Sequence, residues 1–280
     1  MEMVISASDV NKLRTMTGAG MMDCKKALTE ANGDFEAAID ILRKKGQKVS
    51  ASRSDKEASE GAIFIKVNAA ATEGVLVAIN CETDFVAKTD DFQKLGNAIL
   101  ELAADKKPTT AAELLSYNLA DGRTAQEHVI DLVGKIGEKV EISNYYIIKG
   151  ECVVPYIHSN LKLGVLVALK GGNGNEVVEA GKDVSMQIAA MKPIAVDKDG
   201  VDAKTIEREI EVGKEQARAE GKPEAMLEKI ALGKLNKFYK DNTLLNQDFV
   251  KDGSKSIAQY LDSVVKGLTV TEFKRVSVAG

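Results

Sequence analysis

A six-residue stretch that occurs twice constrains the fold of this chain more than any other feature. Residues 74–79 read GVLVAI and residues 164–169 read GVLVAL, so five of the six positions match at a spacing of 90. A continuous apolar run rich in β-branched residues is typical of a strand covered on both faces. Apolar strands can match by chance. However, each copy follows a strand-like segment and precedes apolar residues at helical spacing, which favours a duplicated strand–strand–helix unit.

The repeat predicts an α+β fold whose core consists of two related halves, each an antiparallel sheet with helices. We place the first half at residues 61–145 and the second at 146–280. The second half contains a charged segment at about 200–240 with apolar residues at helical spacing. Pro223 splits this segment, so we expect an inserted helical hairpin that projects from the core.

The sequence of residues 1–46 predicts a separate module of three short helices joined by glycine turns. Asn32-Gly33 follows the second helix and Gly46 follows the third. Glycine accepts the left-handed conformation that often ends a helix. The next segment, residues 47–60, is polar, charged and rich in serine. Such a composition predicts a linker between the module and the core.

The composition excludes several classes of protein. The net charge of −4 gives no broad basic character, so we expect no direct binding to nucleic acid. No apolar run approaches the roughly 20 residues of a membrane span, and the N-terminal stretch MEMVISASDV lacks the pattern of a secretion signal. The three cysteines are far apart, which fits a reducing compartment without a disulfide framework. We therefore expect a cytoplasmic protein.

The sequence offers little catalytic chemistry. Its two histidines, His128 and His158, do not form a spaced ligand pair, and no common catalytic or metal-binding motif occurs. Gly172 and Gly174 follow a strand, but Val177 stands where a dinucleotide-binding motif needs its third glycine. These observations predict no cofactor, no metal and no catalytic residue, and they favour a binding or regulatory protein over an enzyme.

The connection after the first apolar strand, residues 82–88, reads ETDFVAK and places Phe85 beside Asp84. One alternative is that Phe85 folds back onto the sheet while Asp84 caps the next helix. Thr89 and Asp90 are better placed to cap that helix. We therefore expect an exposed aromatic on a loop between rigid elements, which is the usual form of an interface hot spot.

Two adjacent methionines, Met21 and Met22, begin the second helix. Neighbouring helical positions do not face the same narrow stripe, so we expect one of the two to be exposed. Exposed methionine is common at binding surfaces because its side chain adapts its shape. Partial burial of both within the small module is the alternative.

Two long stretches resemble the signature sequences of the elongation factor Ts family. They are TGAGMMDCKKAL at residues 17–28 and NCETDFVAK at residues 80–88. Shorter stretches match in the family's order, namely YIH at 156–158, IAAMKP at 188–193 and GKPE at 221–224. The resemblance extends over nearly the whole chain.

The resemblance implies a guanine-nucleotide exchange factor for elongation factor Tu, the GTPase that delivers aminoacyl-tRNA to the ribosome. It implies that the N-terminal module is a UBA-like bundle that docks on the nucleotide-binding domain of this partner. Arg14, Met21 and Met22 stand where the family makes this contact. His158 lies in the part of the second half that resembles the family's grip on a different domain of the partner.

The resemblance further implies that residues 83–86 form the element that wedges into the GTPase near its magnesium site. These residues are Thr83, Asp84, Phe85 and Val86. By resemblance, the factor binds both GDP-bound and nucleotide-free elongation factor Tu. The hairpin resembles a coiled-coil or dimerisation element of the family, which is compatible with a homodimer or a 2:2 complex.

The C-terminal region differs from many bacterial members, which carry a further helix after the last strand. We expect the last strand here at 268–278, so any partner contact made by that helix is not expected. Two rival functions remain beside nucleotide exchange. One is a scaffold whose N-terminal module recognises ubiquitin-like or other proteins, and the other is an enzyme with a cleft near His158.

Overall fold

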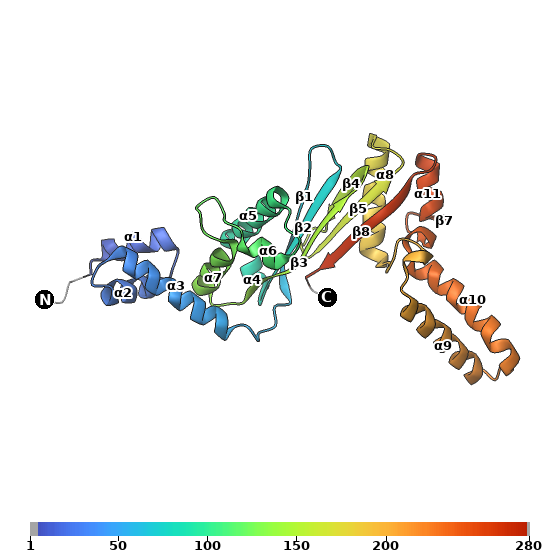
Figure 1. The fold of residues 1–280 in the computed structure, drawn as a ribbon, viewed down its shortest axis with the longest axis horizontal. Coiled ribbons are helices and arrows are strands. Elements are labelled where there is room, and N and C mark those ends of the chain that lie inside the picture. The colour runs from blue at the N-terminus through green and yellow to red at the C-terminus, as the bar shows by residue number, and fades with distance from the viewer. Residues whose placement is uncertain (1–4, 279–280) are drawn as a thin grey trace.

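The computed structural model describes residues 5–278, and the outermost residues of the predicted N-terminal module and second half lie outside this range. Within it, three parts follow one another along the long axis of the molecule (Figure 1). A helical module lies at one end, a core of two sheets and their helices lies in the middle, and a helical hairpin projects at the other end. The predicted α+β architecture is confirmed.

The module contains the three predicted helices within residues 5–52. They are α1 (Ala7–Thr17), α2 (Met21–Glu30) and α3 (Phe35–Ser52). Leu13, Cys24 and Leu28 are fully buried at its centre, since the apolar positions of each helix recur on one face. Whether this bundle is UBA-like stays a prediction.

The predicted end of the third helix at Gly46 is wrong, because α3 continues to Ser52, into the segment predicted as a linker. Gly46 is buried where α3 crosses α7 (Ala125–Ile136). A Cβ atom on Gly134 would lie 2.8 Å from the Cα atom of Gly46. This glycine therefore permits a close approach of two helices and does not end one. The module is held to the core by helix packing as well as by the chain.

The core strands of residues 5–278 form two three-stranded antiparallel sheets. The first has the order β1-β2-β3, from β1 (Glu60–Val67), β2 (Glu73–Cys81) and β3 (Val140–Lys149). The second has the order β4-β5-β8, from β4 (Cys152–Ile157), β5 (Leu163–Lys170) and β8 (Thr269–Ser277). Helices α5 (Asp90–Lys106), α6 (Ala111–Ser116) and α7 pack on the first sheet, and α8 (Asn175–Met191) and α11 (Ile257–Val264) pack on the second.

The repeat of the sequence is a repeat of the structure. The matching stretches lie in β2 and β5, the central strand of each sheet. The register shifts between Ala78 and Ile79 in one and between Ala168 and Leu169 in the other, again 90 positions apart. Two strand–strand–helix units with the same irregularity support the predicted duplication.

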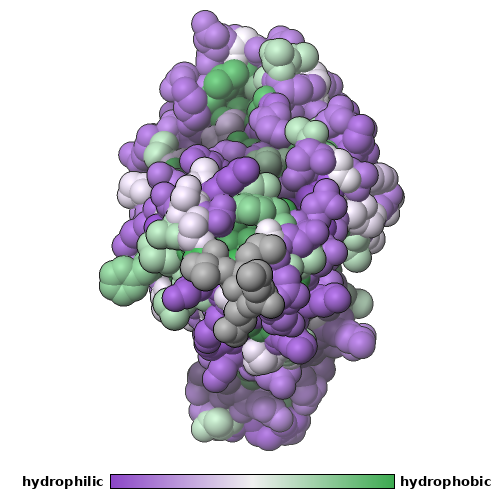
Figure 2. All heavy atoms as spheres, turned by 90° about the vertical axis from the view of Figure 1, so that its left-hand side faces the viewer, coloured by the Kyte–Doolittle hydropathy of each residue, from purple (hydrophilic) through white to green (hydrophobic). Residues whose placement is uncertain are grey.

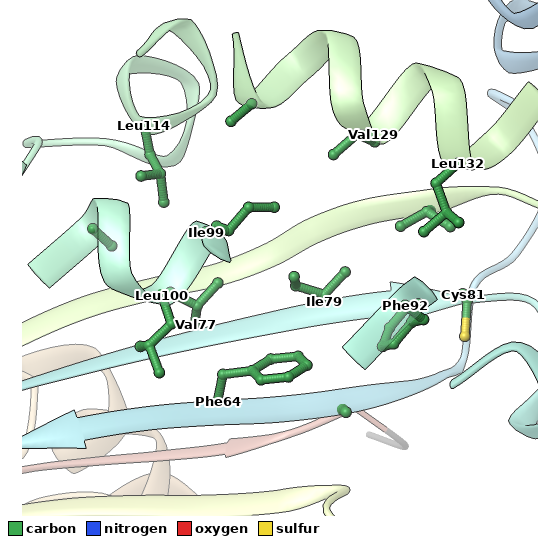
Figure 3. Close-up of a cluster of buried hydrophobic side chains, with 14 of the residues drawn as sticks. Phe64, Val77, Ile79, Cys81, Phe92, Ile99, Leu100, Leu114, Val129 and Leu132 are labelled. Carbon is green, nitrogen blue, oxygen red and sulfur yellow. The ribbon is translucent and has the colours of Figure 1, made fainter. Parts of the chain in front are cut away.

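The two sheets pack face to face between the two sets of helices (Figure 1). Gly74 and Gly164, the first residue of each matching stretch, lie in this interface. A Cβ atom on Gly74 would lie 2.8 Å from Leu166 Cδ2, and one on Gly164 would lie 2.4 Å from Ile63 Cγ2. Both glycines are thus explained by the close approach of the sheets. On the other face of the first sheet, Phe64 and Ile79 belong to a buried cluster that also contains residues of α5, α6 and α7 (Figure 3).

The predicted hairpin consists of α9 (Ala203–Ala219) and α10 (Glu224–Asn242). Its base is fixed to α8 by two buried glutamines. The Gln187 amide Nε2 donates to Gln247 Oε1 at 3.1 Å, and Gln247 Nε2 donates to the carbonyl of Asp241 at 3.0 Å. A short pair of strands, β6 (Asp248–Phe249) and β7 (Asp252–Ser256), follows the hairpin. None of the helices in residues 5–278 has the length and apolar character needed to cross a membrane.

Candidate functional site

The two halves of the core differ in the connection between their central strand and the following helix. The central strands repeat at a spacing of 90, but α5 begins at Asp90 and α8 at Asn175, a spacing of 85. The first half therefore has five additional residues at this point. They include the short helix α4 (Asp84–Ala87), whereas the second half has only the turn of residues 171–174.

The segment predicted as a loop is a single helical turn. The Thr83 hydroxyl accepts a long hydrogen bond of 3.5 Å from the Val86 amide and caps α4 at its N-terminus. Val86 and Ala87 are buried in the core of the first half. Successive side chains on a helix point about 100° apart. Because Val86 and Ala87 point into the core, the side chain of Phe85 points outward.

Phe85 is 79% exposed, the largest exposure among the large hydrophobic side chains of the described residues. The alternative in which it folds back onto the sheet is therefore wrong. Thr89 caps α5 by accepting from the Phe92 amide, as expected from the sequence. A turn with one buried and one exposed side can hold an aromatic ring out for a partner without unfolding.

The acid beside the aromatic is paired on its own turn. Lys88 Nζ donates to Asp84 Oδ2 at 2.6 Å, and this hydrogen bond lowers the pKa of the Asp84 carboxyl and raises that of Lys88. The positive charge of Lys162, which lies between β4 and β5, lowers the pKa of Asp84 further. The turn between β4 and β5 lies at the same end of the core as α4, because Lys162 forms an ion pair with Glu60, which lies opposite Cys81 at the end of β2.

His158 occupies this same turn. Its backbone amide donates to the carbonyl of Leu163 at 2.8 Å, and its Nδ1 atom lies 2.9 Å from the Tyr156 hydroxyl. The side chain is exposed. Within residues 5–278 no group of three or more His, Cys, Asp or Glu side chains is arranged to hold a metal ion. His158 thus lies on the surface, beside the Tyr156 hydroxyl.

The N-terminal module presents the other predicted contact residues. Met21 and Met22 are 56% and 63% exposed, so both are exposed and not only one. Arg14 on α1 is also exposed. Met16, which the sequence did not single out, is exposed as well and lies just before the turn to α2. Figure 1 shows the module apart from α4, so the structure does not bring these residues together with Phe85.

A groove of about 1080 Å³ lies between the module and the first half of the core. Its lining includes apolar side chains of α1, α3 and α5, such as Met16, Leu42 and Leu95, and charged side chains such as Asp91 and Lys135. Figure 2, which views the molecule from the end at which the module lies, shows hydrophobic side chains near the centre of a largely hydrophilic face. The sequence could not predict this groove, because it forms only where α3 packs on α7.

Comparison with known proteins identifies the family of this chain. A family model described as Elongation factor TS matches residues 82–280, which include α4, the second half of the core and the hairpin. The chain belongs to the elongation factor Ts family. An elongation factor Ts of Cytophaga hutchinsonii is 68% identical over 275 residues, which cover 98% of this chain and 99% of the relative.

Further relatives support this membership across the whole length. An elongation factor Ts of Amoebophilus asiaticus is 56% identical over 99% of both chains, and one of Flavobacterium psychrophilum is 51% identical over 98% of both. The resemblance inferred from the two signature stretches is therefore confirmed. In this family member the second stretch, residues 80–88, contains the end of β2 and the whole of α4.

Proposed function

We propose that this chain is a guanine-nucleotide exchange factor that binds elongation factor Tu and promotes the release of GDP during translation elongation. Membership of the elongation factor Ts family supports the partner and the reaction. The observation that carries the mechanism is Phe85, exposed on a turn whose next two residues, Val86 and Ala87, are buried. An exposed aromatic on a fixed support is suited to enter a pocket of another protein.

Exchange of this kind needs no catalytic residue in the factor. A factor that binds the nucleotide-free GTPase more tightly than the GDP-bound form must weaken GDP binding by the same ratio. We propose that Thr83, Asp84, Phe85 and Val86 enter the partner near its magnesium and phosphate site. Magnesium bridges the phosphate oxygens in such GTPases, so disturbing it weakens the hold on GDP. The factor itself carries no cofactor in this proposal.

The remaining contacts supply affinity. We assign docking on the nucleotide-binding domain of the partner to the N-terminal module through Arg14, Met21 and Met22, and a grip on another domain to the surface around His158. The exposure of these side chains supports the assignment. The proposal includes action in the cytoplasm, without direct contact to nucleic acid or membrane, and is compatible with a homodimer or a 2:2 complex.

The test is stopped-flow release of a fluorescent GDP analogue from elongation factor Tu, with and without this protein. Strong acceleration that saturates with protein concentration is expected. Binding without acceleration would overturn the proposal in favour of a scaffold. Turnover of a substrate in the absence of any GTPase would instead support an enzyme.

A further inference from the structure

Two glutamate side chains continue the pairing of β2 and β3 beyond the end of the sheet and hold the base of α4. They accept the hydrogen bonds that backbone carbonyls would accept in a regular ladder. The ladder between β2 and β3 ends with Cys81 opposite Val140. In the same antiparallel register, the next pairs beyond this end are Glu82 with Lys139 and Thr83 with Glu138. The backbones do not pair at these positions, but each pair is joined by hydrogen bonds to a glutamate side chain.

The hydrogen bonds of the two pairs are reciprocal. The Lys139 amide donates to Glu82 Oε1 at 2.7 Å, and the Thr83 amide donates to Glu138 Oε2 at 3.1 Å. The Thr83 hydroxyl adds a bond to Glu138 Oε1 at 2.9 Å. Each carboxylate therefore binds the backbone of the opposite segment. Hydrogen bonds to an ionised carboxylate are about twice as strong as bonds between neutral groups. We call this arrangement, Glu82 and Glu138 with their partners, the carboxylate clamp.

The carboxylate clamp acts on the residue that determines where α4 begins. Thr83 is the N-cap of α4, and its hydroxyl, which accepts from the Val86 amide, also donates to Glu138. The Thr83 carbonyl accepts a weak bond from Cys81 Sγ at 3.1 Å. Glu138 follows the left-handed Gly137 at the end of α7, a helix of the core. The clamp thus fixes the direction of α4, and with it Phe85, against two rigid elements.

Helix α3 reaches the same clamp from the N-terminal module. Arg53, the C-cap of α3, places its guanidinium 3.3 Å from Glu82 Oε2. Glu82 is only 18% exposed, whereas Arg53 is more accessible. An ion pair of this exposure contributes modestly to stability. Its position is nevertheless informative, because it joins the helix of the docking module to the base of the exposed turn.

We propose that Glu82 and Glu138 are positioning residues for nucleotide exchange, which hold the Phe85 turn rigid while it enters the partner. This inference rests on the proposed function. A contact that must displace groups in the partner is effective only when it is held in its bound geometry in advance. Loss of the clamp leaves the contact surface of Phe85 and of the N-terminal module in place. The step of GDP release therefore slows while the affinity for the partner changes little.

The test compares the full-length wild-type protein with Glu138→Ala, Glu138→Gln and a control, Glu141→Ala. Glu141 lies three positions further along, on β3, and its exposed carboxylate pairs with the Lys139 side chain. A glutamine at 138 keeps an oxygen for the Thr83 amide, so it should restore most of the wild-type behaviour. Hydrogen exchange of the α4 amides in the free protein is measured beside stopped-flow GDP release.

For Glu138→Ala we expect α4 amide exchange about 10-fold faster and a maximal release rate about 10-fold lower, as for loss of a charged hydrogen bond. The half-saturating concentration should stay within about twofold of wild type, since binding to the partner is retained. Glu141→Ala should match the wild-type protein in all three measurements.

The two measurements separate the inference from the proposed function. If the wild-type protein does not accelerate release, the proposed function fails, while hydrogen exchange still reports on the clamp. Unchanged protection of α4 in Glu138→Ala would overturn the clamp whatever the activity. Lost protection with a wild-type release rate would overturn the positioning role. If Glu138→Ala does not fold, Glu82→Ala, which removes the bond to the Lys139 amide, takes its place with the same expectations.

Discussion

Truncation of Phe85 separates the role of this side chain in folding from its role in exchange. Phe85 is 79% exposed in the free protein, so Phe85→Ala removes few contacts within the fold. The free energy of unfolding should change by no more than about 0.5 kcal/mol. Phe92 provides the matched control, because it is 1% exposed in the core of the first half. Phe92→Ala should cost about 3–5 kcal/mol of stability.

The expected effect on exchange follows from burial of the same ring by the partner. Fully burying an aromatic side chain of this size contributes about 2 kcal/mol. If this contact forms only as GDP leaves, its loss lowers the maximal release rate roughly 30-fold. Phe85→Leu retains much of the apolar surface, so its rate should fall between those of the wild type and Phe85→Ala.

The assay is stopped-flow release of a fluorescent GDP analogue from elongation factor Tu over a range of factor concentrations, with thermal unfolding of each variant in parallel. A wild-type release rate for Phe85→Ala would refute the insertion of this ring into the partner. A large loss of thermal stability in Phe85→Ala would refute the reasoning in another way, because it would give the exposed ring a role in the fold.

Three further predictions concern the module, its junction with the core, and the buried thiol of β2. Met21→Ala combined with Met22→Ala should raise the half-saturating concentration about 10-fold without lowering the maximal rate, as titration calorimetry and release kinetics can show. Gly134→Ala should destabilise the protein by about 1–3 kcal/mol in thermal unfolding, because the new Cβ would lie 2.8 Å from Gly46 Cα. Burial raises the pKa of the Cys81 thiol from 9.0 to about 12. The native state therefore holds this proton more tightly than the unfolded state. Stability measured by denaturant titration should fall as the pH rises from about 9 toward 12, and a thiol reagent at pH 8 should modify Cys81 only after unfolding.

Much of the fold could be predicted from the sequence because its strongest signals are local. The repeated stretches predicted two related sheets, and Pro223 predicted the hairpin. Gly46 was misinterpreted because the same residue type serves two purposes. Glycine can end a helix through its left-handed conformation or let another helix approach closely, and only the position of Gly134, 88 residues later, decides between them.

The candidate site was predictable to a smaller extent. The sequence singled out Phe85 because this aromatic residue stands beside an acid in a short connection. The structure confirms that its side chain is exposed. The residues that support it could not be found in the same way. Glu138 lies 55 positions from Thr83, and only the antiparallel register of β2 and β3 brings the two together. The carboxylate clamp and the groove beside Met16 both form between segments that are far apart in the sequence. No local sequence pattern therefore predicts them.

The two halves of the core differ at the turn that carries Phe85. Both halves retain the central strand with its shifted register and the helix that covers it. They differ by five residues at the surface, where insertions are tolerated because few buried contacts change. In the second half, Gly171 adopts a positive φ of 116° and the chain enters α8 directly. In the first half, the additional residues gain a cap from Thr83 and buried anchors from Val86 and Ala87. These contacts make the additional residues a fixed turn, which holds the exposed Phe85 at a defined angle to the core.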